Sequence, residues 1–173
     1  MSESHTFSAF LAPELESEIA ITRRILAAVP DGHNDFKPHD KSMTLARLAA
    51  HVAELPSFAS VTLTNPNFDL AAPNSYKPHV FETSAQNLAA FDSLAADAIA
   101  TVNATSDEKF GEPWSLVYGD YEIFKGTRHS AFRAMAMSHL VHHRAQLGVY
   151  LRLNDIPVPS TYGPSADEAP APN

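Results

Sequence analysis

The stretch Ser138-His139-Leu140-Val141-His142-His143-Arg144-Ala145-Gln146 decides the fold and the chemistry expected of this chain. His139 and His143 are four positions apart, a spacing that puts two side chains one turn apart on the same face of an α-helix. The helical pattern around them extends from about residue 127 to 153, and its stripe also holds Phe132, Met135, Gln146 and Tyr150. We expect this stripe to face the core. The opposite arc holds Arg133, Met137 and Arg144.

Two helical patterns lie in the first third of the chain. The first covers about residues 13–29, where Pro13 suits the first turn and the acidic residues after it favour a helix N-terminus. The second covers about residues 43–63, with Ser42 or Thr44 as its N-cap. Pro56 removes one backbone hydrogen bond inside it, so we expect a kink one turn after His51.

A third helix is predicted from Thr83 or Ser84 to about residue 102, since Thr83 and Gln86 match a capping box. Residues 65–82 are expected to form a long loop. The segment 105–126 resembles a short hairpin or an ordered loop, and its aromatic residues could line a pocket over a bound ion or form their own small core: Trp114, Tyr118, Tyr121 and Phe124. The fold class predicted is all-α, a four-helix bundle with this insert between its third and fourth helices. The link between the second and third helices permits either up-down-up-down or up-down-down-up order.

Composition narrows the class of protein. The chain has 173 residues, a formal net charge of −8 and no Cys. It suits one domain over residues 1–173, with a core of about 10–156 and a tail, 157–173, that is expected to fray after Tyr162. The acidic charge argues against nucleic-acid binding, and no apolar run is long enough for a membrane span. Without a recognisable leader, we expect a soluble, cytoplasmic protein.

His51 lies in the apolar stripe of the second predicted helix. With His139 and His143 it would give three imidazoles on two facing helices, a ligand set that leaves positions open for water or substrate. Such a site suits nickel or zinc, and also iron. The residues three positions before these His are Leu48, Ala136 and Leu140, so a Glu-x-x-His di-iron pattern is missing and a mononuclear site is expected.

The alternative is structural. A single His on an apolar stripe is more often a hydrogen-bonded core residue than a ligand, but three adjacent neutral imidazoles without an ion leave several polar groups to satisfy. His142 lies at the edge of the inward arc and is expected to pack or to support the ligands. The other His residues lie in loops or near the ends of elements and are expected on the surface: His5, His33, His39, His79 and His129.

These residues resemble the DinB-like family, also called YfiT-like metalloenzymes. The similarity is carried by His51 in Leu48-Ala49-Ala50-His51-Val52-Ala53-Glu54-Leu55 and by the H-x-x-x-H-R-x-Q stretch that begins at His139. Ala145 stands where relatives commonly have Gly. The resemblance implies a four-helix bundle in up-down-down-up order and a divalent metal held by His51, His139 and His143. Some relatives look like thiol transferases, whereas most have no assigned reaction.

The function expected is that of a mononuclear metal-dependent enzyme, a hydrolase or a transferase, acting on a small molecule. The metal would activate water or a low-molecular-weight thiol. Tyr150 and Glu54 are candidates for proton transfer. The alternative is a non-enzymatic metal-binding module for stress response or protein interaction, and a site open to solvent would favour the enzyme. The long helices are also compatible with a homodimer.

Overall fold

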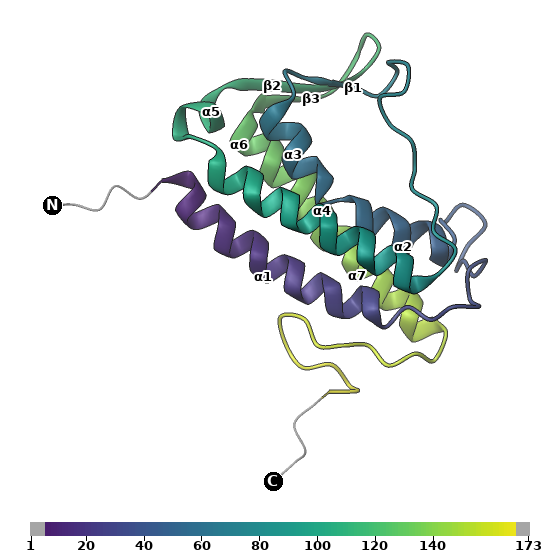
Figure 1. The fold of residues 1–173 in the computed structure, drawn as a ribbon. Helices are drawn as coiled ribbons and strands as arrows, with labels where there is room; N and C mark the ends of the chain where they lie inside the picture. Colours follow the sequence, from purple (N-terminus) through teal and green to yellow (C-terminus); the bar gives the residue numbers. More distant parts are fainter. Residues whose placement is uncertain (1–5, 169–173) are drawn as a thin grey trace, which may run out of the picture.

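The computed structural model describes residues 6–168. Four helical segments form a bundle, and a small sheet covers one end of it (Figure 1). The first segment is α1 (Phe7–Ala27), the second is α2 (Leu45–Glu54) followed by α3 (Ser57–Thr64), and the third is α4 (Ser84–Ala104). The fourth is continuous through α6 (Arg128–Ala131), the π-helix η1 (Phe132–Ser138) and α7 (His139–Leu153). No described helix is long and apolar enough to cross a membrane.

Contacts between helix ends show the direction of each segment. The N–H of Ser84 at the start of α4 donates to Asp31, just beyond the end of α1, so these two helices are antiparallel. Tyr150 near the end of α7 donates to the carbonyl of Met43 just before α2, so these segments also run in opposite directions. Figure 1 shows α1 and the α6–α7 segment running the same way, with the linker after α3 returning along the bundle. The order is up-down-down-up.

Two helix boundaries depend on proline. The prediction that the first helix begins near Pro13 was wrong: α1 begins at Phe7, and the hydroxyl of its N-cap Thr6 accepts the N–H of Ala9. Pro13 lies inside α1. The burial of Leu11 and Ala12 favours helical structure in the residues before this proline. At Pro56 a kink in one continuous helix was predicted. The structure instead has a break there, between α2 and α3.

The all-α prediction left out a small mixed sheet, two of whose strands lie largely in the segment predicted to be a short hairpin or an ordered loop. Its strands, in the order in which they pair, are β1 (Phe68–Asp69), β2 (Pro113–Tyr118) and β3 (Tyr121–Thr127). A short helix, α5 (Asp107–Gly111), precedes β2. The strand β1 lies in the segment expected to be a loop and pairs in parallel with β2, which is antiparallel to β3. Two residues are too few for an alternating pattern, so β1 has no local signal.

Apolar side chains form two main clusters along the bundle. One lies around α2 and α7 and the other around α3 and η1, and Phe58 packs against both. Trp114 belongs to a third, small cluster under the sheet. The prediction that Met137 and Arg144 face away from the core was wrong, since both are buried. They face away from His139 but lie where η1 and α7 pack on the rest of the bundle, so the fourth segment is covered on more than one side.

The tail is ordered as far as it is described. Arg24 of α1 pairs with Glu168, and Arg152 of α7 pairs with Asp167. The expectation that the tail frays after Tyr162 was therefore wrong for residues 163–168. Residues 169–173 lie outside the described part of the chain.

Candidate metal centre

The structure brings His51, His139 and His143 together between α2 and α7. One ring nitrogen of each lies within 4.8 Å of the others, and all three side chains are half-buried. The Nε2 atoms of His51 and His139 are 3.4 Å apart. This set is the one group of three His or acidic residues among residues 6–168 with that convergence.

The remaining ring nitrogens are held by hydrogen bonds. Nδ1 of His51 donates to Oε1 of Glu54 at 2.6 Å, and Nδ1 of His143 lies 2.7 Å from Oε1 of Gln146. His139 hydrogen-bonds the backbone of Met135, and because this contact raises the pKa of His139 the ring donates and the carbonyl accepts. The π-helix η1 contains Met135 and ends at the residue before His139, and such segments are frequent at functional sites.

This arrangement fits a metal ion. Because Nδ1 of His51 donates to Glu54, the Nε2 of His51 is an acceptor, and it faces the Nε2 of His139 across 3.4 Å. One metal ion could bind both of these nitrogens. Two nitrogens bound to one tetrahedral ion at the usual zinc distance would be about 3.3 Å apart, which agrees with the observed separation.

The pKa values of His139 and His143 in the metal-free protein also suit metal ligands. Burial, and secondarily the nearby His143 and His51, lower the pKa of His139 to about 4. Burial likewise lowers the pKa of His143, against the opposing effect of its hydrogen bond to Gln146. Both rings are therefore neutral at physiological pH, which is the form that binds a metal.

Behind His51 lies a buried carboxylate that the sequence suggested only as a proton carrier. Glu54 is 2% exposed, and its Oε1 accepts hydrogen bonds from His51, from Nη2 of Arg47 at 2.8 Å and from the hydroxyl of Tyr76 at 2.5 Å. Its Oε2 accepts the N–H of His79 at 3.1 Å. Burial by itself raises the pKa of Glu54, but these four donors outweigh it and lower the pKa to about 2.

Arg47 and Tyr76 were missed by the sequence analysis. Arg47 is one helical turn from His51, a weak signal that could have been noticed. Tyr76 belongs to the linker before α4 and reaches Glu54 only through the fold. His79 is exposed, as expected, yet its backbone completes the hydrogen bonds of Glu54.

The other candidate residues lie around this cluster. His142 is outside it, and its Nε2 accepts from the amide of Gln146, the residue that holds His143. Tyr150 is buried, and its hydroxyl donates to the carbonyl of Met43. Tyr118 and Tyr121 are exposed where β2 turns into β3, and neither lines the pockets that adjoin the His cluster.

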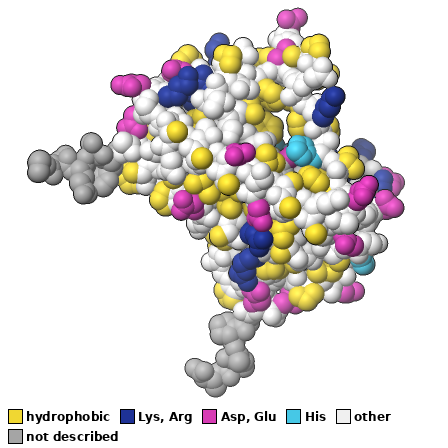
Figure 2. Space-filling model, viewed as in Figure 1, with side chains coloured by type: hydrophobic (Ala, Val, Ile, Leu, Met, Phe, Trp, Pro, Cys, Tyr) yellow, Lys and Arg dark blue, Asp and Glu magenta, His cyan; other side chains and the backbone are white. Residues whose placement is uncertain are grey.

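Two pockets adjoin the His cluster. One, of about 430 Å³, is lined by His143 itself together with Lys41, Ser42, Met43, Gln146, Val149 and Tyr150. The other, of about 260 Å³, lies between α3 and the linker and is bounded by Glu54, Phe58 and Tyr76. Figure 2 shows a hollow on this face with hydrophobic side chains in its wall and a His exposed at its edge. Because His143 lines the first of these pockets, the cluster is not sealed by packed side chains.

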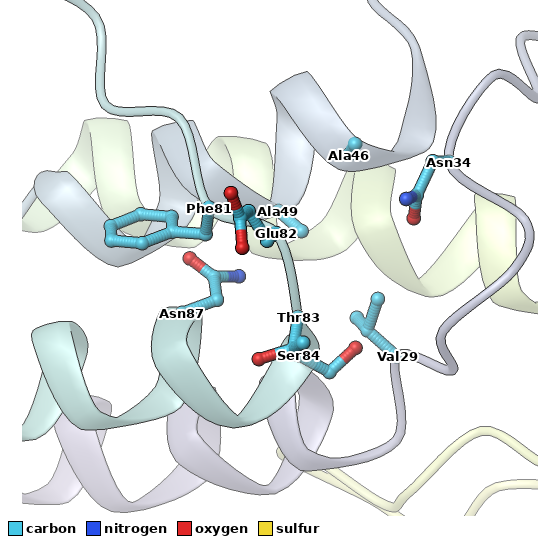
Figure 3. A pocket seen from close by; sticks show the side chains of 9 residues that line it. All are labelled: Val29, Asn34, Ala46, Ala49, Phe81, Glu82, Thr83, Ser84 and Asn87. Carbon is cyan, nitrogen blue, oxygen red and sulfur yellow. The ribbon is translucent and has the colours of Figure 1, made fainter.

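A third pocket is unsuited to a substrate. It lies where the start of α4 meets α2 and the end of α1 (Figure 3), and its volume is about 20 Å³. Asn87 is 5% exposed, and within the described residues its Oδ1 has no partner. The space is sufficient for about one water molecule, which would satisfy this oxygen.

The fold and the His cluster together define a class, helical bundles with a site suited to one metal ion. The sequence model of the DinB family matches residues 1–172, and the chain belongs to this family. This result confirms the resemblance noted from the His residues. A search of curated proteins gives no match.

Solved structures share the fold. YjoA, a DinB-like protein from Bacillus subtilis, is 21% identical with a TM-score of 0.66, over 87% of this chain and 96% of that one. A DinB-like protein from Bacillus cereus is 18% identical with a TM-score of 0.68, over 91% and 98%. YfiT from Bacillus subtilis, described as a probable metal-dependent hydrolase with an unusual four-helix bundle topology, is 16% identical with a TM-score of 0.64, over 91% and 94%. Similarity at these identities concerns the fold.

Proposed function

We propose that this chain is a metal-dependent hydrolase in which His51, His139 and His143 hold one divalent ion, nickel or zinc before iron. The observation that carries the proposal is the convergence of three imidazoles whose other nitrogens are already engaged. A bound divalent ion supplies Lewis-acid activation of water, or of a low-molecular-weight thiol, near neutral pH.

Residues around the His cluster would orient the ligands and transfer protons. Glu54 accepts the Nδ1 hydrogen of His51 and so keeps its Nε2 free and aimed at the ion. Gln146 does the same for His143. Tyr150 lines the pocket beside His143 and is the candidate for proton transfer there, since its hydroxyl oxygen can still accept a hydrogen bond.

The pockets beside the cluster favour an enzyme over a non-enzymatic metal-binding module. A structural site is closed by its ligands and by packed side chains, whereas a reactive site keeps a position open. His143 lines a pocket, and three protein ligands leave at least one position on a tetrahedral ion. The description of YfiT as a probable metal-dependent hydrolase supports hydrolysis as the reaction class.

Elemental analysis of purified protein tests the metal site. The variants H51A, H139A and H143A should each lose most of the bound metal, whereas H142A, which alters the adjacent His outside the cluster, should retain it. Retention of metal in both H139A and H143A would overturn the assignment.

A screen of ester, amide and thiol-transfer substrates then tests the reaction. Activity should be lost on chelation and restored by the native ion. Thiol transfer without hydrolysis would replace the hydrolase by a transferase at the same site, and metal binding without any turnover would favour the non-enzymatic module.

A further inference from the structure

Lys77 carries a positive charge that no acidic side chain offsets. Within residues 6–168, every Arg and two of the Lys residues form ion pairs with Asp or Glu. The described Lys residues without such a partner are Lys37, Lys41 and Lys77. An unpaired cation is unexpected in a chain of net charge −8, where carboxylates are in excess.

Two of these three Lys residues lie beside the His cluster. Lys77 lines the pocket between α3 and the linker, and Lys41 lines the pocket that contains His143. No acidic residue lines the Lys41 pocket, and Glu54 is the one acidic residue lining the Lys77 pocket. Glu54 does not act as a free negative charge there, because both of its oxygens are occupied by the donors described above. An anion entering either pocket therefore meets uncompensated positive charge.

The Lys77 pocket also has an aromatic wall. Phe58 of α3 and Phe68 of β1 both line it, and their rings meet edge to face with centroids 6.1 Å apart. The ring of Phe58 also lies 6.1 Å from the ring of His139. A molecule that packs on Phe58 therefore sits beside the His cluster.

We propose that the pocket between α3 and the linker binds the substrate, and that this substrate is a small monoanion with an aromatic or branched apolar group. This inference rests on the proposed function. The apolar group packs on Phe58 and Phe68, and a carboxylate pairs with Lys77. A monoanion is favoured over a phosphate ester because one Lys supplies the only unpaired charge of this pocket, whereas a dianionic phosphate is usually held by several donors.

Phenylacetate is a suitable probe, with 2-phenylethanol and phenethylammonium as neutral and cationic analogues of similar size. Binding is measured by calorimetry and by NMR chemical-shift changes, on the full chain as purified. Phenylacetate should bind more tightly than 2-phenylethanol, and phenethylammonium should bind most weakly. The difference should shrink in high salt, since Lys77 is exposed.

Lys variants locate the site. K77Q should weaken phenylacetate binding about fivefold, whereas K37Q, which removes another unpaired Lys outside both pockets, should not. F68L should weaken phenylacetate and 2-phenylethanol alike. Equal binding of the three probes, or equal losses in K77Q and K37Q, would overturn the proposal, and a loss confined to K41Q would overturn the choice of pocket.

The same measurement on H139A separates this proposal from the metal site. Suppose that the wild-type protein holds no metal, but that H139A still binds phenylacetate and loses this binding when Lys77 is also replaced. This result would support the pocket and overturn the proposed function. Metal binding by the wild type together with probe binding indifferent to K77Q would leave the proposed function standing and overturn the pocket.

Discussion

Nδ1 of His51 lies 2.6 Å from Oε1 of Glu54, the same oxygen that accepts the hydroxyl of Tyr76. One buried carboxylate therefore links a candidate ligand on α2 to Tyr76 in the linker between α3 and α4, which lies 22 positions beyond Glu54. A carboxylate in this position orients the imidazole and raises its basicity toward a metal. The candidate metal site and the wall of the adjacent pocket thus share one group.

The first prediction concerns this carboxylate. E54Q keeps the shape of the side chain but removes its charge, so we expect metal affinity to fall about 10–100-fold. Y76F removes one of the four donors and should have a smaller effect in the same direction. Affinity is measured by competition with a chromogenic chelator. The matched control is Y162F, which removes a hydroxyl bonded to Glu18 and Arg144 rather than to Glu54; an E54Q affinity equal to that of the wild type would contradict the role given to Glu54.

The second prediction couples metal to stability. The three His residues come from α2 and α7, so a bound ion should hold these helices together and raise the melting temperature. Protons compete for the imidazoles as pH falls, so the stabilisation should decrease in acid. Thermal melts with and without chelator should differ strongly at pH 7.5 and weakly at pH 5.5. Identical melts at pH 7.5, with metal loss verified by elemental analysis, would show that the ion does not stabilise the fold.

The third prediction concerns the metal-free protein. The pKa of His139 is about 4 in the folded state and near 6.5 when the chain is unfolded. Between these values the unfolded chain binds a proton that the folded chain does not, so the free energy of unfolding should fall as pH is lowered from about 6.5 to 4. Because the ring is partly exposed, we expect a loss of about 1–2 kcal/mol. Urea unfolding across this range measures it, and H139N should show a shallower pH dependence than the wild type.

The fourth prediction compares two arginines that both pair with α1. Arg144 is 2% exposed and donates to Glu18 at 2.6 Å, whereas Arg133 is 41% exposed and pairs with Glu14. R144A removes the ion-pair partner of Glu18, whose carboxylate is largely buried. This substitution should lower the free energy of unfolding by about 3–5 kcal/mol. R133A should cost about 0–1 kcal/mol. Urea unfolding measures both, and similar costs would show that burial does not distinguish the two pairs.

Metal content provides a further check on Arg144. Its guanidinium contacts Glu18 and Thr22 of α1 and the hydroxyl of Tyr162 in the tail, so its role is to join α7 to those segments. Folded R144A should therefore keep its metal, although Arg144 is adjacent to His143 in sequence. Loss of metal from folded R144A would place this residue in the metal site.

Local sequence patterns were sufficient for the existence of the four long helical segments and for the central members of the candidate site. The spacing of His139 and His143 puts both rings on one face, since the α-helix repeats every 3.6 residues. The stripe around His51 identified its inward face in the same way. The cap at Thr83 and a disturbance of the helix at Pro56, expected as a kink and found as a break, were also predicted, because each depends on residues within one or two turns.

The tertiary structure decided what depends on distant residues. Tyr76 hydrogen-bonds Arg47, which lies 29 positions earlier in the chain. The strand β1 exists because Phe68 pairs with Leu116, which follows α4 in the sequence. The burial of Met137 and Arg144 depends on the other helices that cover η1 and α7. Helical periodicity is a property of neighbouring residues, whereas the contacts of Glu54 with Tyr76 and His79, the sheet and the pockets form only where distant segments pack together. The sequence by itself therefore determined the four long helical segments and the three inward His residues, and the tertiary structure decided the start of α1, the short elements and what surrounds the His residues.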